Sequence, residues 1–73
     1  MKIIRVRRYS GHKGGSNFYH HADLYANNAK EAIAKAKTCT NWRWIDKFDE
    51  SDTDYVRYES LGEITPTTAK NPQ

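Results

Sequence analysis

The sequence has little of several features, and each absence excludes a class of protein. Cys39 is the single cysteine among 73 residues, so no internal disulfide can form and a zinc site of four cysteines is excluded. No run approaches the ~20 apolar residues of a membrane span, and the first residues lack the apolar core of a signal peptide. We therefore expect a soluble, cytoplasmic protein.

Acidic residues are also missing from the start of the chain, where the first is Asp23. The preceding stretch contains five cations, interleaved with aromatic residues and histidines: Lys2, Arg5, Arg7, Arg8 and Lys13, with Tyr9, His12, Phe18, Tyr19, His20 and His21. Cations that neutralise phosphates, alternating with rings that can stack, suit a polyanionic partner. Residues 46–54 carry five acids and one lysine, so the net charge of +3 is unevenly distributed.

The residues that could support catalysis or metal binding are too sparse for an enzyme. No recognisable nucleophile motif surrounds Cys39, and 73 residues leave little room for an enclosed pocket. His20 and His21 are adjacent on a predicted strand, so they point to opposite faces and cannot easily share a metal. We expect no catalytic site, no metal and no cofactor.

Alternation of apolar and polar residues predicts two antiparallel strands at the start of the chain. Residues 1–9 place Val6 on one face and Arg7 on the other, and residues 18–25 alternate in the same way. The glycine-rich segment 10–17 between them is typical of a hairpin connection.

A helix and a second hairpin are predicted next. Asn27 or Asn28 can cap a helix that runs to about Thr38, with an alanine-rich stripe that allows close packing on a sheet. Residues 41–48 and 55–61 are aromatic, β-prone runs joined by the acidic segment. They predict two further strands.

These elements predict one α+β domain over residues 1–64. Its sheet has four antiparallel strands in the order β-β-α-β-β, with one helix on one face. Residues 65–73 contain Pro66 and Pro72 and no large apolar side chain, so they are predicted to form a flexible C-terminal tail. One helix covers one face of such a sheet, so the opposite face must meet solvent or a partner.

The uncovered face is the main functional prediction. It gathers Ile3, Arg5, Arg7, Tyr9, Tyr19, His21, Tyr25, Tyr55 and Arg57, with Trp44 or Arg43 according to the register of residues 41–48. The glycine-rich loop can bring Lys13 to the same partner. We predict a partner-binding site formed by Arg5, Arg7, Tyr9, Lys13, Tyr19, His21, Tyr55 and Arg57.

Three interpretations of this face remain open. For nucleic acid, Arg5, Arg7 and Lys13 would contact phosphates while tyrosines stack on bases. For a protein partner, arginine and tyrosine are the residues enriched at interfaces. The same residues could also form cross-strand pairs that stabilise the sheet without binding anything. Sheet edges free of proline leave a homodimer open as well.

The run Tyr-Ala-Asn-Asn-Ala-Lys-Glu-Ala-Ile-Ala-Lys-Ala, at positions 25–36, passes from a strand into the alanine-striped helix. It belongs to a stretch, residues 22–48, that resembles small phage-encoded anti-CRISPR proteins, which pair one helix with an antiparallel sheet. The resemblance implies an inhibitor that occupies a surface of a bacterial defence nucleoprotein complex in the host cytoplasm. The leading expectation is therefore a non-enzymatic binding protein that acts on an acidic macromolecular surface. Direct nucleic-acid binding is the alternative.

Overall fold

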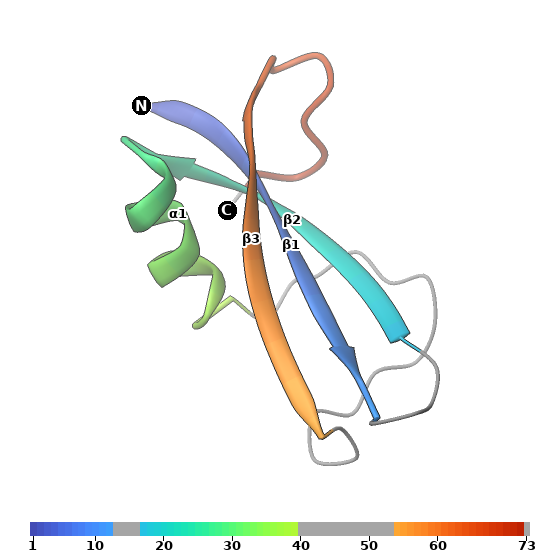
Figure 1. Ribbon diagram of the computed structural model, residues 1–73. Helices are drawn as coiled ribbons and strands as arrows, with labels where there is room; N and C mark the ends of the chain where they lie inside the picture. The colour runs from blue at the N-terminus through green and yellow to red at the C-terminus, as the bar shows by residue number, and fades with distance from the viewer. Residues whose placement is uncertain (13–16, 40–53, 73) are drawn as a thin grey trace.

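A three-stranded sheet with β1 at its centre organises the chain (Figure 1). The computed structural model describes residues 1–12, 17–39 and 54–72. These ranges contain β1 (Lys2–Gly11), β2 (Asn17–Ala26), α1 (Ala29–Ala36) and β3 (Tyr55–Ile64). β1 pairs antiparallel with β2 on one side and with β3 on the other, so β2 and β3 run parallel to each other.

The predicted four-stranded sheet in the order β-β-α-β-β is wrong. The described residues form a three-stranded antiparallel sheet, in the order β2-β1-β3, with one helix. The reason is that β1 is paired along both sides: residues from Ile3 to Gly11 have partners in β2 and in β3. β3 thus pairs with the first strand of the chain, along the side of β1 that β2 leaves free. The predicted strand at 41–48 lies outside the described residues.

Small and branched apolar residues on one face of the sheet pack against α1. We call this face the inner face. Its core consists of Ile4, Val6, Ala22, Leu24 and Ala26 from the sheet, with Ala32 and Ala36 from the helix. Ile33, Cys39 and Tyr58 are partly buried against it. Ala29 is exposed, because the helix turns its Ala32 and Ala36 side toward the sheet. Alanines on both surfaces bring the helix close to the strands.

The helix begins where its sequence predicts. The Oδ1 atom of Asn28 accepts a hydrogen bond of 2.8 Å from the backbone N–H of Glu31, as expected for an N-cap. Glu31 and Lys35 form an i,i+4 ion pair, with an N–O distance of 3.6 Å. No helix within the described ranges has the length and apolar character needed to cross a membrane.

A bulge in β3 keeps the strand paired beyond its predicted end. Arg5 lies opposite Gly62 while Val6 lies opposite Ser60, so Leu61 is an extra residue in β3. Gly62 adopts a φ of 94°, a conformation that side-chain-bearing residues rarely accept. The sequence prediction ended this strand at Leu61, whereas the glycine allows it to continue to Ile64.

The residues after β3 turn back along the sheet at the end where β1 begins (Figure 1). The hydroxyl of Thr65 forms hydrogen bonds with those of Thr67 and Thr68, at 3.0 and 2.9 Å. The backbone N–H groups of Thr68 and Ala69 both donate to the Thr65 carbonyl. The predicted flexible tail therefore contains a compact turn, and its flexibility stays a prediction.

Candidate partner-binding face

The predicted site residues lie mostly on the sheet face opposite α1, which we call the outer face. Alternation places the odd-numbered residues of β1 there, and strand register adds their partners. Tyr19 lies opposite Tyr9, His21 opposite Arg7, and Arg57 opposite Tyr9 from the other side. The sequence prediction of which residues share this face is confirmed for β1 and β2.

Four of the predicted residues are connected by contacts and form the Arg–Tyr cluster: Arg7, Tyr9, Tyr19 and Arg57. The rings of Tyr9 and Tyr19 meet edge to face, with centroids 4.9 Å apart and planes at 80°. The guanidinium carbon of Arg57 lies 4.9 Å from the centroid of the Tyr9 ring. Arg7 donates a hydrogen bond of 3.0 Å to the Tyr9 hydroxyl, and its guanidinium lies within 6 Å of both ring centroids. Tyr9 is therefore the centre of the cluster.

The two arginines of the Arg–Tyr cluster contact aromatic rings, and they form no ion pair with the acidic residues that the structure describes. Among the described residues no carboxylate lies within ion-pair distance of Arg7 or Arg57. Glu59 lies opposite Arg7 in the register, without an ion pair. A guanidinium over a tyrosine ring keeps its full charge while its orientation is fixed. Both arginines can thus still meet an anionic group.

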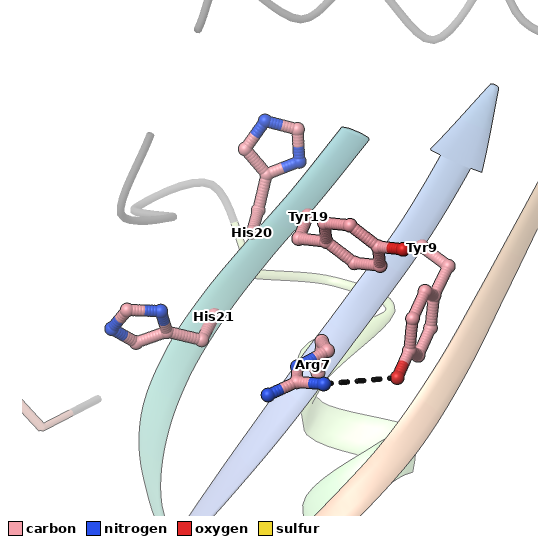
Figure 2. A pocket seen from close by; sticks show the side chains of 5 residues that line it. All are labelled: Arg7, Tyr9, Tyr19, His20 and His21. Atoms are coloured by element: carbon pink, nitrogen blue, oxygen red, sulfur yellow. Dashed lines mark hydrogen bonds between the residues drawn. The ribbon is translucent and has the colours of Figure 1, made fainter. Parts of the chain in front are cut away.

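An open hollow of about 340 Å³ adjoins the Arg–Tyr cluster (Figure 2). Its lining residues are Arg7, Tyr9, Tyr19, His20 and His21. Figure 2 shows Tyr19 lying across from β2 toward β1 with Arg7 over β1, while His21 points away from them at the far side of β2. The Tyr19 side chain is 43% exposed, so ring surface remains available to a ligand.

Arg5 is on the outer face but is already paired. Its Nε donates to Oδ1 of Asp23 at 2.7 Å and its Nη2 donates to Oδ2 at 3.1 Å. Asp23 is 2% exposed although it belongs to the outer face, and the backbone N–H of Lys70 donates to its Oδ2 at 2.8 Å. The Arg5 charge is therefore neutralised within the protein.

The pKa of Asp23 reflects this environment. Burial alone would raise it, but hydrogen bonds from Arg5 and from the Lys70 N–H, with the charge of Arg5, hold the pKa below its ordinary value. The hydrogen bond to Asp23 raises the pKa of Arg5. Asp23 thus stays ionised, and the pair behaves as a structural ion pair.

The other predicted cations are distributed differently. Arg8 belongs to the inner face and is 6% exposed, so the basic stretch of the sequence is split between two faces. Lys13 lies outside the described residues. Tyr55 begins β3 opposite Gly11 and is exposed on the outer face. Near it, Nδ1 of His12 lies 3.7 Å from Oδ2 of Asp54.

Sequence reasoning missed the acids and the C-terminal residues of this face. Asp23 alternates with His21 and lies opposite Arg5, so strand pairing was the signal that could have found it. Lys70 and Thr68 reach the face through their backbone, at separations of 47 and 63 residues from Asp23 and Arg5. Sequence patterns carry no signal for such contacts.

The described residues contain no group of three His, Cys, Asp or Glu side chains that could hold a metal ion. Comparison with protein-family models, with curated proteins and with solved structures gave no match. The resemblance to phage-encoded inhibitors therefore stays a prediction, and a functional argument rests on the outer face itself.

Proposed function

We propose that the chain is a non-enzymatic binding module whose outer face engages an acidic macromolecular surface. The observation that supports this most is the Arg–Tyr cluster. Arg7 and Arg57 contact the Tyr9 ring on an exposed sheet face, and no carboxylate of the described residues pairs with either. Fixed rings and unneutralised guanidinium groups offer a partner both apolar area and charge at little entropic cost.

The balance of charge favours a protein surface over a phosphate backbone. Of the predicted cations on the outer face, Arg5 is neutralised by Asp23, and Glu59 adds negative charge beside Arg7. Nucleic-acid affinity depends on many cations that replace counterions, whereas tyrosine and arginine supply much of the binding energy at protein interfaces. The leading form is an inhibitor that occludes an acidic protein surface, such as one on a host CRISPR-type nucleoprotein complex.

Direct nucleic-acid binding is the second candidate, favoured by one observation. The volume of the hollow beside Arg7 is close to that of the smallest small-molecule sites, ~300 Å³. The exposed ring of Tyr19 forms part of its lining. A base could stack on Tyr19 while Arg7 contacts a phosphate. In this form Arg57 and Tyr55 would extend the contact along β3.

Affinity capture from a bacterial lysate, with and without nuclease, tests the proposal and separates its two forms. The chain and an Arg7→Glu/Arg57→Glu variant serve as parallel baits. A protein that survives nuclease and is lost with the variant supports the protein-binding form. Partners that all disappear with nuclease favour nucleic acid, and affinity for oligonucleotides should then fall steeply with salt. A set of partners identical for both baits contradicts the proposal.

A further inference from the structure

The outer face is partly occupied by the chain itself. Residues 65–72, which we call the C-terminal strap, follow β3. They pack on the same outer face as the Arg–Tyr cluster, at the other end of that face. The Lys70 N–H donates to Asp23 Oδ2 at 2.8 Å, and Arg5 Nη2 donates to the Thr68 carbonyl at 3.4 Å. Two outer-face residues at this end, Ile3 and Asp23, are buried, whereas Tyr25, which lies opposite Ile3, is exposed.

The strap and the Arg–Tyr cluster are close neighbours. Arg5 and Arg7 belong to the same strand and the same face, so their Cα atoms are separated by roughly 7 Å. The strap therefore ends where the cluster begins, and a ligand that covers the cluster and extends along β1 meets the strap.

The size of the face favours this contact between a protein partner and the strap. Three strands of ten residues span roughly 33 Å by 14 Å, or about 500 Å², from the usual rise per residue and strand spacing. A standard interface buries about 800 Å² on each partner. A protein that forms an interface of standard size on the outer face therefore extends along most of it and reaches the end under the strap.

The strap is attached to the outer face in a way that allows another protein to displace it. Its turn is held by its own hydrogen bonds, through Thr65, so it can move as a unit. Among the described residues, two hydrogen bonds connect it to the face, and most of its residues are exposed. Both bonds use backbone atoms of the strap, which an extended segment of another protein could replace.

We infer that the C-terminal strap is an autoinhibitory element: it covers the Arg5–Asp23 end of the outer face and is displaced when a protein partner binds there. This inference rests on the proposed function. The partner's backbone takes over the hydrogen bonds to Asp23 and Arg5, and its acidic groups reach Arg7 and Arg57. The apparent affinity for the partner equals the intrinsic affinity of the uncovered face multiplied by the fraction of molecules whose strap is undocked.

A proline substitution tests the strap without changing the face. Lys70→Pro removes the N–H that donates to Asp23, whereas Lys70→Ala removes the same charge and keeps the N–H. Amide hydrogen exchange measures release of residues 65–72, and circular dichroism checks that the sheet remains. The probes are a fluorescein-labelled poly-glutamate peptide and a labelled single-stranded oligothymidine, both followed by fluorescence anisotropy.

The expected result is faster exchange in the strap of Lys70→Pro and tighter poly-glutamate binding than for Lys70→Ala. The gain should be about fivefold or more, the lower end of typical coupling between linked equilibria. Equal or weaker poly-glutamate binding, with the strap released, overturns the inference while the proposed function stands. A gain confined to oligothymidine overturns the inference for a protein partner. Absence of binding in every variant overturns both proposals.

Discussion

Arg5 and Asp23 form a two-bond ion pair across β1 and β2, with nitrogen–oxygen distances of 2.7 and 3.1 Å. The pair lies on the face that the sequence marks as basic, and it divides that face in two. One end is neutral and partly covered by the C-terminal strap, and the other holds the partly exposed Arg–Tyr cluster. Arg5 therefore stabilises the fold, whereas the proposed binding function belongs to Arg7 and Arg57.

Arg5→Ala should destabilise the fold more than Arg57→Ala. Removing Arg5 leaves the buried Asp23 carboxylate without its main partner, at a cost of about 1–3 kcal/mol. Arg57 is exposed and contacts the Tyr9 ring, an interaction of about 0.5–1 kcal/mol. Urea unfolding of the two variants measures both free energies. Equal losses would show that the ion pair contributes no more than a surface contact.

Acid should weaken the fold through Asp23. Its pKa in the folded protein lies below the ordinary value of 3.8, so its contribution is fully present above about pH 4 and is lost as the pH falls through the folded pKa. The free energy of unfolding of Asp23→Asn should therefore depend less on pH in this range than that of the parent. Two parallel curves of stability against pH would contradict the assignment.

Gly62→Ala should destabilise the protein by about 1–2 kcal/mol, because its φ of 94° is strained for any residue with a Cβ atom. No heavy atom lies within 4 Å of the position that the Cβ would occupy, so the cost is in the backbone and not in packing. Thermal unfolding gives the loss. Leu61→Ala, at the neighbouring exposed bulge position, is the matched control and should change stability by less than ~0.5 kcal/mol.

The sequence predicted what depends on local periodicity. Alternation separated Val6 from Arg7, and Asn28 was one of the two expected helix caps. The prediction from sequence failed where pairing between residues far apart in the chain determines the structure. The central position of β1 depends on two partners at once, and the ion pair of Arg5 depends on register and on backbone atoms near residue 70. Gly62 shows the same limit, since a glycine that suggests a strand end permits a bulge here.

The central claim is that Arg7 and Arg57 bind an acidic partner through the outer face. The most direct measurement compares Arg7→Glu/Arg57→Glu with Lys30→Glu/Lys37→Glu, which reverses the same number of charges on exposed residues in and just after α1. Both variants have the same net charge, so a general electrostatic effect cannot separate them. Poly-glutamate affinity, measured by fluorescence anisotropy, should be lost with the first pair and fall only slightly with the second. Equal losses, or a larger loss with the helix pair, would contradict the account.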